Sequence, residues 1–167
     1  MRILVFSDSH GDSESMEKVI KRFYPDAVIY LGDGIDDFFI LEKEFPHAKF
    51  YNVAGNIDDK GDVARLERFE DVAIYMSHLE SFAKIKADRE HVFEAMKLNA
   101  KIILYGHTHV PELFVYRGIT FMNPGTISKT FGLRTFGMID LIDDDYLCEI
   151  MFADTLALNW IIFFKKY

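Results

Sequence analysis

The stretch Arg2–His10, which reads RILVFSDSH, decides how this chain folds. Residues 2–7 form a nearly continuous apolar run, which is typical of a strand buried on both faces. Asp8 and His10 follow directly, and residues two apart on extended backbone place their side chains on the same side. The stretch therefore predicts a buried strand that ends in two side chains able to reach one metal ion.

The segments that follow alternate between helix and strand patterns. Apolar residues recur at helical spacing from Met16 to Phe23, Asp12 and Ser13 are suited to cap that helix, and Pro25 prevents its continuation. The next expected elements are a strand at 27–31, a helix at 36–45 and a strand at 49–53. This β-α-β-α-β order predicts a parallel sheet with right-handed crossovers.

Beyond Gly61 short strands dominate, and the pairing is expected to become mostly antiparallel. The expected elements are a hairpin at 64–69 and 72–77, a helix at 88–98, and strands at 101–105, 113–116, 119–122, 135–142 and 146–152. We therefore predict an α/β fold in which two mixed β-sheets form a sandwich flanked by helices.

Length and charge limit the possible functions. The 167 residues, half of them hydrophobic, suffice for one substantial core, so residues 1–167 are expected to form a single domain. Twenty-seven acidic residues against 19 basic ones leave a net charge of −8, and no basic run forms a patch. Strong nucleic-acid binding is not expected from such a surface, and a small phosphate ester is the favoured partner.

Cysteine content and hydropathy predict a cytoplasmic protein. The single Cys148 excludes an internal disulfide, and the strand that begins at Arg2 leaves no room for a cleavable signal. The most apolar stretch, 156–164, is interrupted by Asn159 and is shorter than the roughly 20 residues that span a bilayer, so no membrane association is expected. This segment could cover the protein's own sheet, mediate homo-oligomer contacts or form an arm over a pocket.

Five short polar strings each follow directly after a predicted strand. They are Asp8-Ser9-His10, Gly32-Asp33, Gly55-Asn56-Ile57-Asp58, Ser77-His78 and Gly106-His107-Thr108-His109. Open α/β sheets place ligands at strand ends, and these oxygen and nitrogen donors suit divalent transition metals. The strings therefore predict a metal site built from several parts of the chain. His47 and His91 do not lie at strand ends beside other donors, and they are expected to have no chemical role.

In this order, and followed by Asn123-Pro124-Gly125, the strings resemble the calcineurin-like metallophosphoesterases, most closely the short bacterial and archaeal phosphodiesterases. The resemblance covers about residues 1–150 and leaves 151–167 as a hydrophobic C-terminal extension. It implies a phosphodiesterase that uses two divalent ions, Mn first, with Ni, Zn, Fe or Co as alternatives. The implied ligands are Asp8, His10, Asp33 and His109 for one ion and Asp33, Asn56, His78 and His107 for the other, with Asp33 as the bridge.

The chemistry explains why such a site would be needed. A phosphodiester is anionic, so a catalyst must supply hydroxide at neutral pH and neutralise the charge that builds on the reacting oxygens. Two ions about 3.5–4 Å apart do both. Asn56 is expected to bind metal and substrate, and Asp58 either orients a neighbouring site residue during catalysis or satisfies its own turn. Lys129 or Arg134 could contact the phosphate, or either could be a surface charge.

The sequence also departs from the family pattern. Many relatives carry His or Cys where this chain has Ile57, and a His there can protonate the leaving oxygen. Such a general acid is typically worth 10²–10⁴-fold, so we expect substrates whose leaving group needs little protonation. The alternative function is a non-catalytic scaffold, because a eukaryotic retromer subunit that resembles this family uses the fold to bind proteins.

Overall fold

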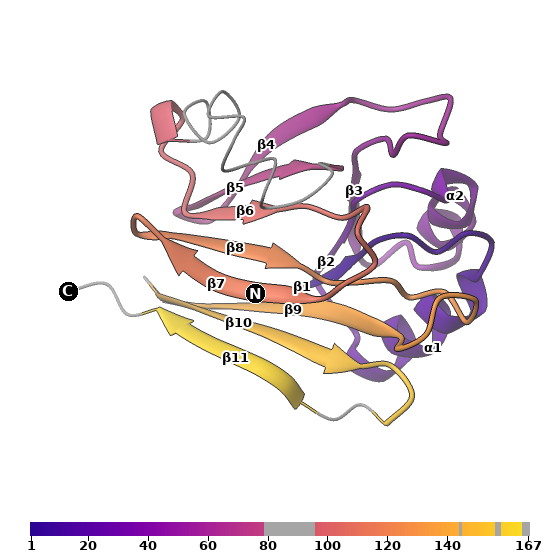
Figure 1. Ribbon diagram of the computed structural model, residues 1–167. Coiled ribbons are helices and arrows are strands. Elements are labelled where there is room, and N and C mark those ends of the chain that lie inside the picture. The colour runs from indigo at the N-terminus through magenta and orange to yellow at the C-terminus, as the bar shows by residue number, and fades with distance from the viewer. Residues whose placement is uncertain (79–95, 144, 156–157, 165–167) are drawn as a thin grey trace.

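The computed structural model describes residues 1–78, 96–143, 145–155 and 158–164. Two β-sheets pack face to face, and helices α1 and α2 lie beside β1–β3 of the first sheet (Figure 1). Both sheets contain parallel and antiparallel pairs. The predicted α/β sandwich of two mixed sheets flanked by helices is therefore confirmed.

The first sheet has six strands in the order β11-β10-β9-β1-β2-β3. Their bounds are β1 Arg2–Phe6, β2 Ala27–Tyr30, β3 Lys49–Asn52, β9 Thr135–Ile142, β10 Asp145–Phe152 and β11 Leu158–Phe164. Strands β1, β2 and β3 pair in parallel, whereas β9, β10 and β11 extend the sheet with antiparallel pairs. The parallel arrangement predicted for the N-terminal strands is confirmed.

The second sheet has five strands in the order β4-β5-β6-β8-β7. Their bounds are β4 Ala64–Phe69, β5 Val72–Ser77, β6 Ile102–Leu104, β7 Glu112–Tyr116 and β8 Ile119–Asn123. The expected antiparallel hairpin of β4 and β5 is present, but β6 pairs in parallel with both of its neighbours. The connections into and out of β6 are long enough to be crossovers, which permits that pairing.

The two helices, α1 Ser13–Phe23 and α2 Ile35–Glu44, connect the parallel strands of the first sheet. The Asp12 carboxylate caps α1 by accepting from the backbone N–H of Ser15 at 3.2 Å, as predicted. Helix α1 ends at Phe23, and its C-cap Tyr24 directly precedes Pro25. The helix expected at 88–98 falls largely within 79–95, which lies outside the described residues.

Strand β1 is buried on both faces. Ile3 and Val5 belong to the core between the sheets, whereas Leu4 and Phe6 pack toward the helices. All four side chains are fully buried, as the apolar run predicts. This burial fixes the end of β1, and with it the start of the polar string that follows.

The C-terminal segment adds a strand to the protein's own sheet. Strand β11 pairs antiparallel with β10 at the edge of the first sheet and lies close to β7 of the second. The segment therefore packs on the protein itself, as one of the expectations had it, but as an edge strand rather than as a cover over a sheet face. It can do so because the edge of β10 has backbone donors and acceptors that a further strand satisfies. Homo-oligomer contacts through this segment stay a prediction. Among the described residues, no helix has the length and apolar character to cross a membrane.

Candidate metal centre

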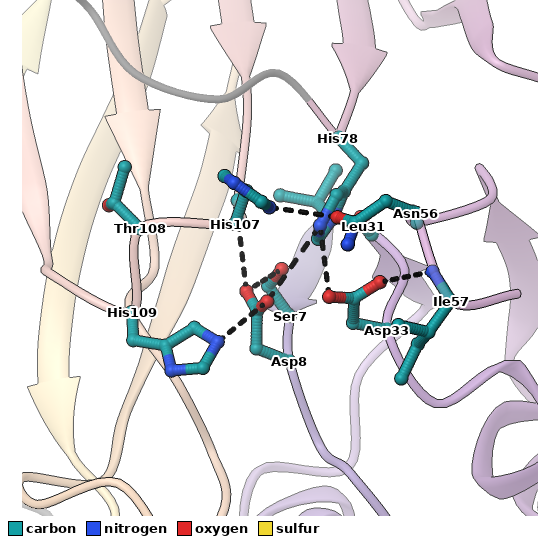
Figure 2. Close-up of polar contacts among 12 residues, drawn as sticks. Ser7, Asp8, Leu31, Asp33, Asn56, Ile57, His78, His107, Thr108 and His109 are labelled. Carbon is teal, nitrogen blue, oxygen red and sulfur yellow. Dashed lines mark hydrogen bonds and ion pairs between the residues drawn. The ribbon is translucent and has the colours of Figure 1, made fainter.

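The predicted donors gather where parallel strands end. Asp8 and His10 follow β1, Asp33 follows β2, and the other donors, Asn56, His78, His107 and His109, follow β3, β5 and β6. Because the carboxyl ends of parallel strands meet at one edge of a sheet, each sheet contributes its donors to the same region. Figure 2 shows the side chains converging, with His109 on the Asp8 side and Asn56 on the Asp33 side.

Six of the donors form two groups, and within each group the ligand atoms lie within 4.8 Å of one another. In the first group, His109 Nε2 lies 3.2 Å from Asp8 Oδ1 and 3.3 Å from His10 Nε2. In the second, which consists of Asp33, His78 and His107, His78 Nε2 lies 3.3 Å from Asp33 Oδ2. Each group contains three of the four residues in one implied ligand set: Asp33 joins only the second group, and Asn56 belongs to neither.

The two groups meet at Asp8 and His78. Asp8 Oδ1 lies 3.9 Å from His78 Nε2, and it therefore sits between histidines of both groups. Asp33 faces His78 with one oxygen and accepts from the backbone N–H of Ile57 with the other, at 3.2 Å. Asn56 lies beside the second group, where its Oδ1 is 2.8 Å from His107 Nδ1. The bridging role of Asp33 stays a prediction.

Two buried polar atoms test whether these residues fit a metal. Among the described residues, neither Asp8 Oδ1 nor His78 Nε2 has a hydrogen-bond partner, although buried polar groups are normally paired. Burial raises the pKa of Asp8 despite the opposing effects of the Ser7 hydroxyl and the two nearby histidines. A divalent cation would supply the missing partner of both atoms, and carboxylate with imidazole is a donor set that such ions accept. The residues fit a metal.

The His78 ring is held by a backbone carbonyl. Its Nδ1 donates to the Leu31 oxygen at 2.6 Å, and its side chain is only 4% exposed. A ligating histidine is expected to donate its second ring nitrogen in this way, which leaves Nε2 with a lone pair toward the metal. No sequence signal identifies this acceptor, because it is a main-chain atom of the residue after β2, 47 positions away in the chain.

Asp58 ties two of the donor loops together. Its carboxylate accepts from the backbone N–H groups of Asp33, Gly34, Ile35 and Gly55 at 2.8, 3.0, 3.0 and 2.8 Å. Burial alone would raise the pKa of Asp58, but these four donors outweigh it and lower the pKa below its ordinary value. Asp58 therefore holds the backbone of the loops that carry Asp33 and Asn56, rather than a histidine ring.

Two glycines allow these loops to touch. A Cβ on Gly32, whose φ is 98°, would collide with the backbone of Gly55. A Cβ on Gly55 would collide with the backbone of Asp33 in turn. The Gly-Asp and Gly-Asn strings therefore need glycine because the two loops cross with no room for a side chain between them.

Five of the seven predicted ligands adopt left-handed backbone conformations, so the extended backbone expected for Asp8 and His10 is wrong: β1 ends at Phe6, and a turn brings the two side chains together. The five are Asp8, His10, Asp33, His107 and His109, with φ values of 55°, 46°, 60°, 69° and 59°. This region disfavours non-glycine residues by roughly 1–2 kcal/mol each. Such residues cluster at functional sites, where the surrounding structure enforces them.

Lys129 and Arg134, the candidate phosphate contacts, both bind carboxylates. The Lys129 ammonium lies 2.8 Å from Glu14 and 3.5 Å from Asp12, and Arg134 pairs with Asp154. The structure does not join either side chain to the donor groups. Substrate binding by Lys129 therefore stays a prediction. Sequence reasoning missed Phe131, which lies between these two residues and packs on His10 and His109.

Fold and site together define a metal-binding α/β sandwich protein. The calcineurin-like phosphoesterase superfamily domain matches residues 1–144, and the chain belongs to this superfamily. The expected resemblance is thereby confirmed.

Two bacterial relatives match nearly the whole chain. The probable metallophosphoesterase YsnB of Bacillus subtilis is 32% identical over 162 residues, which cover 92% of this chain and 91% of YsnB. The phosphodiesterase YfcE of Escherichia coli K12 is 27% identical over an alignment of 177 positions, which covers 92% of this chain and 94% of YfcE.

Solved structures show the same fold. A predicted phosphoesterase from Streptococcus pneumoniae superposes with a TM-score of 0.78 at 26% identity, covering 99% of this chain and 97% of that one. Vps29 of Entamoeba histolytica in complex with zinc superposes with a TM-score of 0.77 at 17% identity, covering 99% of this chain and 100% of that one. At that identity the second match shows the fold alone.

Proposed function

We propose that this protein is a phosphodiesterase that hydrolyses small phosphodiesters with the help of two divalent metal ions. The observation that carries the proposal is the meeting of two buried atoms that lack hydrogen bonds, Asp8 Oδ1 and His78 Nε2, 3.9 Å apart and from different donor groups. Membership of the superfamily and the similarity to a protein named a phosphodiesterase support it.

Each donor then has a defined role. Asp8, His10 and His109 would hold one ion, and the second ion would bind Asp33, Asn56, His78 and His107. When bound, the two cations supply a water of lowered pKa and neutralise charge on the phosphoryl oxygens. The Asn56 amide adds no negative charge, and its nitrogen can donate to a phosphoryl oxygen.

Two cavities border the donor groups. One, of about 370 Å³, is lined by residues that include Asn56, Ser77 and His78, and the other, of about 290 Å³, by residues that include His10 and Ile57. A diester has two alkoxy groups on its phosphorus. A cavity beside each donor group suits a substrate with two small alkoxy groups. We therefore favour a small diester over a monoester.

We further propose Mn²⁺ as the working ion, with Ni, Zn, Fe or Co as alternatives that the same donors accept. A cytoplasmic location is proposed from the single cysteine, which is buried and free. A single domain over residues 1–167 is proposed because the two sheets share one core.

Metal removal tests the proposed function. After dialysis against chelator, the protein is expected to lose activity toward bis-p-nitrophenyl phosphate and to regain it when Mn²⁺ is added. The diester should be hydrolysed faster than p-nitrophenyl phosphate. Measuring kcat/KM for both esters with each metal in turn identifies the preferred ion.

A failure of every metal to restore turnover would contradict the proposal, provided that circular dichroism shows a folded protein. That result would favour the alternative function, a non-catalytic scaffold, which predicts a surface that binds a partner protein and no hydrolysis. All seven predicted ligands are present in the chain, which favours the enzyme.

Replacing Ile57 by histidine tests the missing general acid. The Ile57 side chain is 62% exposed and offers no proton, while its backbone N–H already binds Asp33. Ile57→His is expected to raise kcat/KM for diesters with alkyl leaving groups by about tenfold or more, and to leave p-nitrophenyl diesters nearly unchanged. Equal effects on both classes of ester would contradict this explanation.

A further inference from the structure

The loop 129–134, between β8 and β9, is anchored to the start of α1 at both ends. At one end, the Lys129 backbone N–H donates to Asp12 at 3.0 Å and its ammonium binds Glu14 at 2.8 Å. At the other end, Arg134 donates to the Ser15 hydroxyl at 2.9 Å. The two cations considered for phosphate binding therefore fix the position of this loop.

Phe131, at the centre of this loop, packs against two histidines of the first donor group. Its ring centroid lies 4.8 Å from that of His10 and 4.4 Å from that of His109, at interplanar angles of 57° and 62°. Phe131 is 44% exposed, so burial in the core does not explain its place. The ring therefore meets both histidines at tilted angles while much of the residue stays open to solvent.

The two donor groups are supported differently. In the second group, His78 donates to the Leu31 carbonyl and His107 to the Asn56 amide. Among the described residues, the hydrogen-bond and ion-pair partners of the His10 and His109 ring nitrogens are atoms of the first group itself. Phe131, by contrast, contacts both rings from outside the group.

The geometry points to Phe131 as a positioning residue for the ion of the first group, a role that rests on the proposed function. By packing on His10 and His109, the ring limits the rotamers of both side chains and keeps bulk water from one side of the group. Preorganisation of this kind lowers the entropy lost when the ligands close on an ion. Phe131 touches neither metal nor substrate in this role.

Calorimetric titration of the metal-free protein with Mn²⁺ tests the inference. Wild type is expected to bind two ions, and Phe131→Ala is expected to bind one with unchanged affinity and the other about 10- to 100-fold more weakly. Phe131→Tyr should restore the affinity because it keeps the ring. Leu133→Ala is the matched control, since Leu133 is in the same loop and 67% exposed.

A double-mutant cycle assigns the effect to the first group. In a His10→Ala background, where that group is already broken, Phe131→Ala should change Mn²⁺ affinity less than about twofold. Wild-type affinity of Phe131→Ala for both ions, or an equal loss in both backgrounds, would overturn the inference and leave the proposed function standing. A wild-type protein that binds no divalent ion would overturn both.

Discussion

Replacing His78 by alanine is expected to lower kcat/KM for bis-p-nitrophenyl phosphate by about 1000-fold or more. The ring is held by the Leu31 carbonyl at 2.6 Å and directs Nε2 toward both Asp33 and Asp8, at 3.3 and 3.9 Å. Its loss removes a proposed ligand and the contact between the two groups. Steady-state kinetics at saturating Mn²⁺, combined with the measured metal content, check the prediction.

His47→Ala is the matched control for this variant. His47 is exposed and stacks on Tyr24 with ring centroids 4.1 Å apart, and it precedes β3 rather than following it. Its replacement should leave turnover and metal content at wild-type values. A His78→Ala protein that binds both ions and retains full activity would refute the assigned role.

The second large effect is expected at Asp58. Asp58→Ala removes the acceptor of four backbone N–H groups and should lower the free energy of unfolding of the metal-free protein by about 2–3 kcal/mol. Because water can reach the partly buried site, the loss stays well below four separate hydrogen bonds. Asp58→Asn keeps one acceptor oxygen but turns an amide NH2 toward two of the N–H groups, so it should lose at least half as much. Urea unfolding at pH 7 measures both.

The same residue gives a pH dependence with a defined sign. The folded pKa of Asp58 lies below its ordinary value, so its contribution to stability is present above the unfolded pKa of about 3.9 and is lost as the pH falls through the folded pKa. The stability gap between wild type and Asp58→Asn should therefore shrink in acid below about pH 4. Asp59→Asn, at the exposed neighbouring carboxylate, should show no such gap. A gap that does not depend on pH would contradict the charge-based explanation.

The fold could be predicted largely from local patterns. The apolar run of β1 is buried on both faces, Asp12 caps α1, and the hairpin bounds 64–69 and 72–77 match those of β4 and β5. These features depend on neighbouring residues. Strand order does not: β9 pairs with β1 across more than a hundred residues, and β6 lies between β5 and β8.

The donors could be predicted because each lies in a short string at the end of a strand, but their supports could not. Asp58 binds main-chain groups of a loop 23–25 residues earlier, and His78 binds the carbonyl of Leu31. Lys129 pairs with Glu14, 115 residues away. Main-chain acceptors and distant charge partners have no sequence signal, so these contacts appear only once the chain is folded.

The left-handed conformations of five predicted ligands bear on how this site would evolve. Replacing such a residue with glycine relieves backbone strain, and after the flexibility of glycine in the unfolded chain is subtracted the gain is up to about 1 kcal/mol. In a lineage that no longer needs the activity, stabilising substitutions would therefore be expected to replace Asp33 or His107. A protein that keeps all five residues, although glycine would be more stable at these positions, is under selection for the function of their side chains.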